Sequence, residues 1–191
     1  MFLLKLKIKS YLKILFLTAA FAIAIVSFCV SQYSLYFNVS DSIPKGLYIL
    51  DKRMPKKNDY ALFCLRGEFT ELAKERKYLS NGVCDGLAPI GKQVVAKEGD
   101  FIKINRFGTY VQNERLKRSA PLQFDSKGNI MPQRYLSKVL KEGEYLLIAK
   151  KIYSFDSRYF GIVTKNDILG TIRPVFTYEW KRSLKYVVTF F

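Results

Sequence analysis

The feature that most constrains this chain is an uncharged, apolar run from Ile14 to Val30. The run is preceded by four lysines, Lys5, Lys7, Lys9 and Lys13. With its flanking residues it approaches the roughly 20 residues that cross a bilayer as a helix. Positive charge on its N-terminal side favours a cytoplasmic start, with the rest of the chain outside the membrane. We therefore predict a basic cytoplasmic N-terminus, a single transmembrane anchor and one extracytoplasmic domain, over residues 1–10, 11–31 and 32–191.

A cleaved signal peptide is the alternative interpretation of this segment. Ala22 and Ala24 fit the small-x-small pattern of a cleavage site, but they lie inside the apolar run and not after it. Lipidation at Cys29 is disfavoured because the bulky Phe28 stands where a small residue is needed. An uncleaved anchor is therefore our prediction.

The charge and residue usage narrow the classes of function. The chain has 32 Lys and Arg against 16 Asp and Glu, a net charge of +16, and no histidine. Such a balance predicts attraction to anionic lipid or to nucleic acid. No recognition helix or zinc-finger spacing organises the basic residues, so we expect membrane lipids as partners and not nucleic acid. The absence of histidine excludes catalysis by an imidazole base, and we expect neither a zinc site nor a cofactor.

Two cysteines, Cys64 and Cys84, lie beyond the apolar run. In an oxidising compartment they are expected to form a disulfide. Closing a loop of this size contributes about 3 kcal/mol in the chain-entropy description. Two buried free thiols are the alternative.

Short β-prone runs separated by turn signals predict a mostly β domain, an antiparallel barrel or sheet. A short helix over residues 68–79 is expected inside the disulfide loop, and residues 117–134 indicate an inserted loop or flap. Pro174 should place the residues after it at an edge or in a turn. Residues 186–191 form a β-prone tail. The expected strands cover residues 46–50, 60–65, 92–96, 101–104, 109–112, 145–148 and 168–172.

Polar residues concentrate in the octet from Ser154 to Gly161. In an extended strand Ser154, Asp156 and Arg158 would share one face, with Asp156 and Arg158 forming a charge-assisted pair. That arrangement suits the polar wall of a site. A solvated turn with one surface ion pair is the alternative.

Lys92 is the candidate base because apolar residues flank it on both sides in the sequence. Desolvation can lower a lysine pKa from about 10.4 toward 7 or 8, which leaves part of the amine neutral. A strand lysine that extends its amine to solvent is the alternative.

Ser42 is the candidate nucleophile, in a bend imposed by Pro44 and Gly46. The residue before a proline is held extended, which would aim the Ser42 hydroxyl. Ser40 would project from the same side and could donate to an oxyanion together with the Ser42 backbone N–H. A plain turn without chemistry is the alternative.

Together these segments resemble the bacterial type I signal peptidases, the serine–lysine enzymes that remove export signals. Family members carry Ser-x-Ser-Met-x-Pro or a shorter Ser-x-Pro, then Lys-Arg-Val-Val-x-x-x-Gly-Asp, then Asn-Ser-x-Asp-Ser-Arg-Tyr-x-Gly. Residues 40–44, 92–100 and 154–161 match these three patterns in order. The Pro44 to Tyr48 ending and the two spaced cysteines resemble the conjugative-transfer branch, whose members process pilin precursors.

The resemblance implies roles for six residues. Ser42 would be the nucleophile and Lys92 the general base. Ser40 would complete the oxyanion hole, and Ser154 would orient the lysine. Asp156 and Arg158 would brace the strand that carries Ser154.

The resemblance also implies a setting. The protein would be a single-pass protein of the bacterial inner membrane, with its catalytic domain on the periplasmic side and an apolar rim resting on the membrane. The substrate would be an exported precursor, a signal peptide or prepilin, bound as an added strand. The acyl-enzyme could then react with water or with another amine.

Four departures from the family patterns concern positioning of the substrate. Gln93 stands for the Arg after the lysine, Tyr153 for the Asn before Ser154, Ile43 for Met, and Ala149-Lys150-Lys151 for Gly-Asp-Asn. Two other functions remain open. A non-catalytic assembly factor predicts an exposed, normally charged Lys92. A basic envelope protein that contacts transferred DNA predicts binding that weakens with salt.

Overall fold

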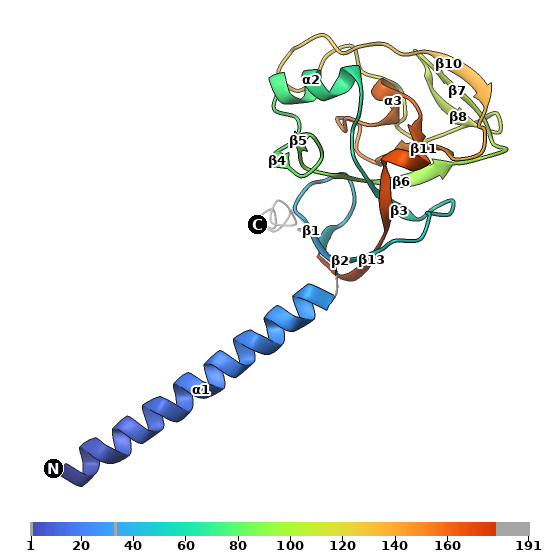
Figure 1. The fold of residues 1–191 in the computed structure, drawn as a ribbon. Coiled ribbons are helices and arrows are strands. Elements are labelled where there is room, and N and C mark those ends of the chain that lie inside the picture. Colours follow the sequence, from blue (N-terminus) through green and yellow to red (C-terminus); the bar gives the residue numbers. More distant parts are fainter. Residues whose placement is uncertain (1, 33, 179–191) are drawn as a thin grey trace, which may run out of the picture. The chain divides into compact units, whose positions relative to one another are not determined.

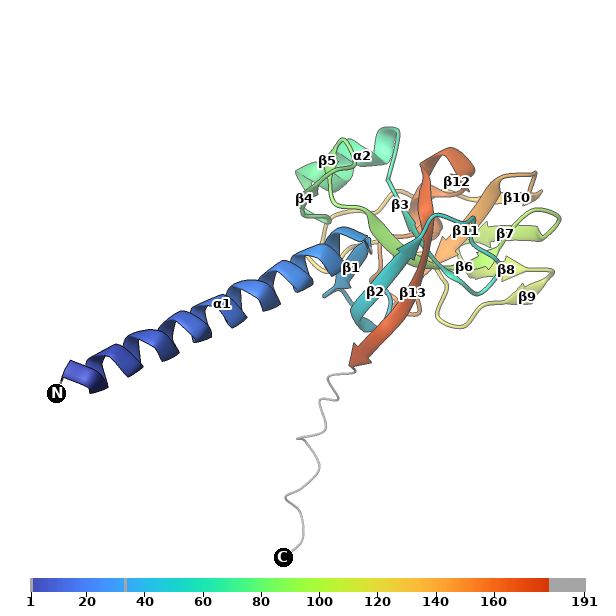
Figure 2. The same cartoon turned by 60° about the horizontal axis from the view of Figure 1, so that its bottom comes forward.

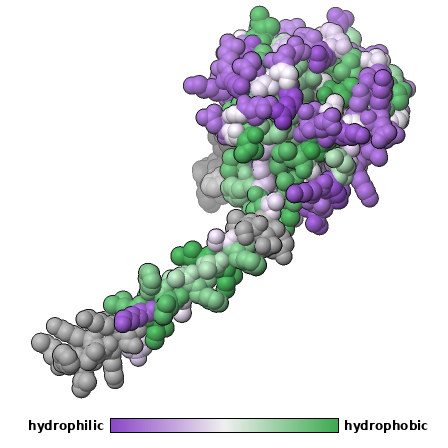
Figure 3. Space-filling view, in the orientation of Figure 1, coloured by the Kyte–Doolittle hydropathy of each residue, from purple (hydrophilic) through white to green (hydrophobic). Residues whose placement is uncertain are grey.

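The computed structural model describes residues 2–32 and 34–178. The chain divides into two compact units, Met1–Leu35 and Tyr36–Phe191. The first unit consists mainly of the helix α1 (Phe2–Gln32), whose described side chains are exposed and largely apolar (Figure 3). Among the described residues, no helix combines the length and the apolar character that a bilayer crossing needs. The anchor over residues 11–31 stays a prediction, and the expected tail over 186–191 lies outside the described residues.

The second unit is built on a seven-stranded sheet (Figure 1). Its pairings from β2 to β12 are antiparallel. We predicted an antiparallel barrel or sheet, and the linear order of the strands corresponds to a sheet. In that order they are β1 (Leu35–Asn38), β2 (Lys45–Asp51), β13 (Ile168–Tyr178), β3 (Tyr60–Phe63), β6 (Ile90–Ala96), β11 (Glu144–Ile148) and β12 (Val163–Thr164).

Smaller elements flank this sheet on opposite sides in both views (Figures 1 and 2). On one side lie the helix α2 (Glu68–Glu75) and the hairpin of β4 (Asn81–Gly82) and β5 (Gly86–Leu87). On the other side lies a four-stranded sheet, ordered β10 (Leu136–Val139), β7 (Phe101–Asn105), β8 (Gly108–Val111) and β9 (Glu114–Arg115). Two short helices complete the domain, α3 (Ser157–Phe160) and the 3₁₀ helix η1 (Lys165–Asp167).

The central strands β3, β6 and β11 are largely buried; β3 and β11 carry near-continuous apolar runs, whereas β6 also contains Lys92 and Gln93. The largest cluster of buried residues packs Phe63, Val94 and Leu147 from these strands against Phe160 of α3. Such burial explains why these segments favour strand, because branched and aromatic side chains pack well on a pleated surface. The consequence for function is that the side chains on the buried face of β6, including that of Lys92, are held by the core of the domain.

The helix α2 is shorter than predicted. It ends at Glu75, four residues before the expected end at Leu79. Lys77 adopts a left-handed conformation with φ of 53°, and the Tyr78 N–H donates to the Ala73 carbonyl at 2.9 Å. This closure turns the chain and points Tyr78 at Phe155, with ring centroids 5.1 Å apart. Aromatic packing therefore overrides a local sequence that favours helix.

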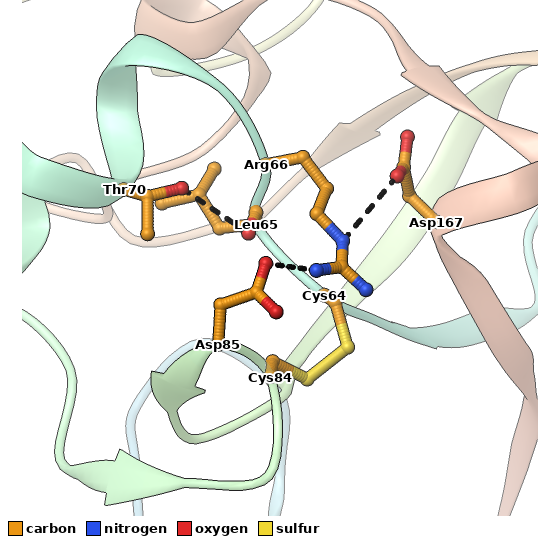
Figure 4. Close-up of a disulfide and its surroundings, with 7 residues drawn as sticks. All are labelled: Cys64, Leu65, Arg66, Thr70, Cys84, Asp85 and Asp167. Carbon is orange, nitrogen blue, oxygen red and sulfur yellow. Dashed lines mark hydrogen bonds and ion pairs between the residues drawn. A yellow bond between two sulfur atoms is a disulfide. The ribbon is translucent and has the colours of Figure 1, made fainter.

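Cys64 and Cys84 form a disulfide, as predicted, and the loop between them contains α2 (Figure 4). The Arg66 guanidinium lies beside the bond and forms an ion pair with Asp85, and its Nε lies 3.9 Å from Asp167. The bridge ties β3 to the β4–β5 hairpin across 20 residues of sequence.

The strand β13 continues through Pro174 to Tyr178. Residues 168–172 pair with β3, whereas the segment after them pairs with β2 alone and shifts register between Pro174 and Phe176. Pro174 thus stands in an edge segment, as predicted. The two strands approach so closely that a Cβ at Gly46 would lie 2.1 Å from the Phe176 carbonyl oxygen. This contact fixes where β2 begins, directly after the Ser42 turn.

The flap over residues 117–134 contains one isolated bridge, between Phe124 and Ile130. It is fastened to the end of α2 by the Tyr78 hydroxyl, which donates to Asp125 at 2.5 Å. This hydrogen bond lowers the pKa of Asp125 well below its usual range. The Leu122 N–H donates to the Tyr159 hydroxyl at 3.0 Å. The predicted inserted loop is therefore fastened to the domain at Leu122 and Asp125.

Candidate active site

Three polar side chains from distant segments meet at one point. The Lys92 Nζ lies 2.5 Å from the Ser42 Oγ and 2.6 Å from the Ser154 Oγ. Lys92 comes from β6, Ser42 from the turn before β2, and Ser154 from the loop before α3. The structure thus brings together the three residues that the sequence nominated as nucleophile, base and orienting hydroxyl.

Lys92 is buried, with 3% of its surface exposed. It shares one face of β6 with Ile90 and Val94, two residues of the largest core cluster. Burial lowers the pKa of Lys92 to about 8, opposed by the negative charge of Asp156 and assisted by the positive charge of Arg158. With that pKa about one amine in ten is neutral at pH 7, compared with far fewer for an ordinary lysine. A neutral amine can accept the proton of a hydroxyl that it contacts.

The octet from Ser154 to Gly161 does not form the predicted extended strand. Asp156 is the N-cap of α3, and its carboxylate accepts a hydrogen bond from the Arg158 backbone N–H at 3.2 Å. Aspartate is a favoured N-cap residue because its carboxylate accepts hydrogen bonds from the first free N–H groups of a helix, and this favours the helical turn over an extended chain. Gly161 ends the turn with φ of 81°, a conformation that glycine adopts without strain.

Asp156 and Arg158 form the predicted pair, fully buried and bidentate, with both contacts at 2.8 Å. The remaining guanidinium hydrogens bind backbone carbonyls of the loop before α3: Lys151, Ile152 and Ser154, at 2.8, 3.0 and 3.1 Å. The pair therefore braces a loop that carries Ser154, and not a strand as we expected. Buried charges are tolerated when all their hydrogen bonds are satisfied in this way.

Asn38, which sequence reasoning missed, holds the turn that carries Ser42. It is 2% exposed, and its Oδ1 accepts bonds from the Ser40 N–H at 3.1 Å and the Ser40 hydroxyl at 2.7 Å. Its Nδ2 donates to the carbonyls of Ser40, Ile43 and Pro44 at 2.9, 3.0 and 3.1 Å. The available signal was its position two residues before a serine, where asparagine commonly closes a turn.

Two further contacts fix the same turn. The Tyr48 hydroxyl donates to the Pro44 carbonyl at 2.5 Å, and Ile43 packs in a buried cluster with Leu62 and Ile172. Burial, with the neighbouring Tyr60 and Tyr36, raises the pKa of Tyr48 to about 12, so this donor keeps its proton. Ser42 itself is half-buried.

Ser40 occupies a different position from the one predicted for a free oxyanion donor. Its hydroxyl donates to Asn38, so it must exchange that bond before it can face an oxyanion. Within the described residues the Ser42 backbone N–H makes no hydrogen bond and is available as a donor.

A cleft of about 570 Å³ opens at Ser42, Lys92 and Ser154. We call it the apolar cleft because exposed aromatic and aliphatic side chains surround its polar end. These are Phe37 from β1, Val39 directly after it, Phe124 from the flap and Tyr153 from the loop before α3. A surface of this kind can hold an extended peptide with apolar side chains beside the three polar groups. Within residues 2–32 and 34–178, no group of three or more Cys, Asp or Glu side chains could hold a metal ion.

The chain is similar to signal peptidases and to proteins of plasmid transfer. A protein-family model described as signal peptidase, peptidase S26, matches residues 8–177. A plasmid transfer protein TraF from Escherichia coli is 38% identical over 147 residues, covering 74% of this chain and 82% of that protein. A conjugal transfer protein TraF from Agrobacterium fabrum is 33% identical over 147 residues, with the same two coverages of 74% and 82%. Among solved structures, a signal peptidase I from Enterococcus faecalis aligns with a TM-score of 0.36 and 16% identity, over 64% of this chain and 100% of that chain.

Proposed function

This chain belongs to the signal peptidase family of peptidase S26, and from that premise we propose that it is a serine endopeptidase with a lysine base. It cleaves a leader segment from exported precursors. The observation that carries the proposal is the buried amine of Lys92, in contact with the hydroxyls of Ser42 and Ser154. A buried lysine without an acidic partner is energetically unfavourable, so its presence here is best explained by a need for a neutral amine.

The first chemical step forms an acyl-enzyme. Neutral Lys92 takes the proton of the Ser42 hydroxyl as the Ser42 Oγ attacks the scissile carbonyl carbon. The negative charge that develops on the carbonyl oxygen is met by the Ser42 N–H and by the Ser40 hydroxyl, once that hydroxyl has turned from Asn38. Lys92 then gives its extra proton to the leaving amine as the C–N bond breaks, which leaves the acyl group on Ser42.

The second step releases the product. Water or a second peptide amine attacks the acyl carbon and loses a proton to Lys92. The Lys92 ammonium then gives a proton to the Ser42 Oγ as the bond between Ser42 and the acyl carbon breaks. Ser154 keeps the Lys92 Nζ aimed at Ser42 throughout, because its Oγ accepts a hydrogen bond on the other side of the amine. Asp156 and Arg158 hold Ser154 in place through its backbone carbonyl.

For the biological setting we propose a precursor used in conjugative transfer, because the matched relatives are a plasmid transfer protein and a conjugal transfer protein. A prepilin is the candidate. We further propose that residues 11–31 anchor the protein in the inner membrane with the catalytic domain on the periplasmic side. The Cys64–Cys84 disulfide favours such an oxidising compartment.

The rival hypothesis of a non-catalytic assembly factor predicted an exposed, normally charged Lys92. A 3% exposed amine with a lowered pKa opposes it. No observation favours the third hypothesis, of an envelope protein that contacts DNA.

The test is cleavage of a detergent-solubilised candidate prepilin by the full chain, read by mass spectrometry. We expect one defined cut that is lost in Ser42→Ala, with activity rising with pH through about 8 as Lys92 loses its proton. A folded protein that cuts none of several precursors would favour the assembly factor. Activity that is flat from acid to mildly alkaline pH would count against the lysine base.

A further inference from the structure

We infer that a second, basic hollow beside Ser42 binds a carboxylate of the substrate, on the side of the scissile bond opposite the apolar cleft. The inference rests on the proposed peptidase function and names the class of substrate: a precursor whose apolar segment is separated by the cut from an acidic one. The occupant is an acidic peptide segment.

The basic hollow has a volume of about 350 Å³. Three lysines and one aspartate supply its charged side chains, and the half-buried Tyr60 and Gln93 contribute to its wall. Asp41 lies 3.1 Å from Lys45, so these two charges balance each other. The charge that remains is that of Lys150 and Lys151, the two consecutive lysines after β11.

Lys150 and Lys151 have no ion-pair partner among the described residues. Other cations of this domain do find acids, including Arg53, Arg66 and Lys138. The chain at Lys151 is held in place, because its carbonyl accepts bonds from the buried Arg158 at 2.8 Å and from the Ser154 N–H at 3.2 Å. Two unpaired ammonium groups on a braced loop form a site for an anionic group.

Ser42 and Lys151 line both the basic hollow and the apolar cleft, whereas Lys92 and Ser154 line the cleft alone. A peptide whose carbonyl reaches Ser42 must therefore extend into both. The chemistry of the two walls differs: exposed aromatic and aliphatic side chains line the cleft, Lys150 lines the hollow, and Lys151 lies where the two meet. Charge complementarity assigns a carboxylate to the second side.

Two departures from the family patterns line this hollow. Lys150-Lys151 stands where the pattern has Asp-Asn, and Gln93 stands where it has Arg. The pattern's Asp and Arg carry opposite charges that sum to zero, whereas the two lysines and the neutral Gln93 sum to +2, so a substrate would meet a more positive wall here. The Gln93 Nε2 is already engaged with the Asn58 carbonyl at 3.3 Å, which leaves the lysines as the cationic groups.

The test measures binding, so that it does not depend on cleavage. The full chain with Ser42→Ala, in a neutral detergent and 0.15 M salt, is titrated against dansyl-labelled peptides by fluorescence anisotropy. One peptide is Ala-Leu-Ala-Leu-Ala followed by Glu-Glu, and the second ends in Gln-Gln. The third carries Glu-Glu before the apolar part. At this salt, long-range attraction to the overall positive charge is largely screened.

We expect the first peptide to bind about fivefold to tenfold more tightly than the second and the third, in line with two partly exposed ion pairs. The double variant Lys150→Gln/Lys151→Gln should reduce that ratio to about one. The matched control Lys103→Gln/Lys117→Gln removes the same charge from exposed lysines outside both hollows and should leave the ratio unchanged.

Equal affinities for the three peptides overturn the inference, as does a preference that survives the loss of Lys150 and Lys151. Undetectable binding of the first peptide overturns it as well. Failure of the proposed function is a separate result: the chain with Ser42 intact would show the expected preference in binding but cut neither the first peptide nor the second.

Discussion

The two partners of the proposed dyad are held in opposite ways. Lys92 lies on a central strand, buried at 3% exposure and backed by the core and by the Asp156–Arg158 pair. Ser42 lies on a half-buried turn outside the regular elements, held mainly by the side chain of Asn38. The difference follows from their tasks. A lysine is neutral only when it is removed from water, whereas a nucleophile must stay accessible to a chain that comes from outside.

This contrast predicts that damage on the two sides differs in kind. Changes around Lys92 should alter global stability and the pH dependence of cleavage, because its environment is the core. Changes around Ser42 should alter the rate with smaller effects on stability, because its environment is local.

The largest effect is expected from removing the dyad itself. Lys92→Met and Ser42→Ala should each reduce cleavage by at least about a thousandfold, since each removes an essential group of the same step. Their stabilities should differ. The folded-state pKa of Lys92 is lowered, so the unfolded chain binds the proton more tightly, and stability is lost as pH falls through about 8.

Lys92→Met should therefore raise the free energy of unfolding at pH 6 by about 1–3 kcal/mol, and the gain should vanish above about pH 10. Ser42→Ala should change it little at either pH. Urea denaturation at the two pH values measures both. A Lys92→Met protein that is less stable than wild type at pH 6 would contradict the view that burial disfavours the charged form of Lys92.

The next largest effect is expected for Asp156→Ala. It leaves the buried Arg158 guanidinium without its carboxylate, and the Ala149 N–H without its acceptor at 3.0 Å. Breaking a buried pair in this way costs about 3–5 kcal/mol. The matched control is Glu142→Ala, which removes an exposed acid 3.9 Å from Lys165 and should cost little. The midpoints of thermal unfolding of the two variants test this prediction. Similar midpoints for both would refute the bracing role of Asp156.

Loss of the Cys64–Cys84 disulfide should lower stability by about 3 kcal/mol, for a closed loop of 20 residues. The bond contacts neither half of the dyad, so the pH at which cleavage is half-maximal should stay unchanged. Limited proteolysis with and without reductant should show cuts near α2 only after reduction. Equal sensitivity in both conditions would argue against a stabilising bridge.

A smaller loss of stability than for Asp156→Ala or for the broken disulfide is expected for Asn38→Ala, about 1–3 kcal/mol, because partly exposed carbonyls of the turn can bind water instead. Its effect should appear in the rate: kcat falls about tenfold, whereas KM and the pH midpoint barely move. Asn38→Asp keeps the acceptor for Ser40 but removes the donor to Ile43 and Pro44, so it should recover only part of kcat.

Asn105→Ala is the matched control for Asn38. Asn105 also binds backbone groups of a turn, the N–H groups of Phe107 and Gly108 at 2.9 and 3.1 Å, but it lies outside both hollows. It should leave kcat unchanged. A loss of kcat as large as that of Asn38→Ala would show that Asn38 acts through general stability and not through the turn.

The sequence by itself determined which residues are candidates for the site, and it determined most of the strands. A serine enzyme without histidine needs another base, and apolar flanks predicted that Lys92 is buried, which the structure confirms. Strand segments such as 101–104 and 145–148 were predictable because alternation and turn residues act over a few positions. Local preference failed at the octet and at the end of α2. There a buried ion pair and an aromatic contact decided the conformation.

Only the tertiary structure decided which groups meet. Lys92 contacts hydroxyls 50 and 62 residues away in the sequence, and the Asn38 side chain becomes a buried clamp only when β1 joins the sheet. The basic hollow likewise joins residues from the Ser42 turn, β6 and the loop after β11. Burial and long-range hydrogen bonds depend on how distant strands pack, and a pattern over neighbouring residues does not contain that information.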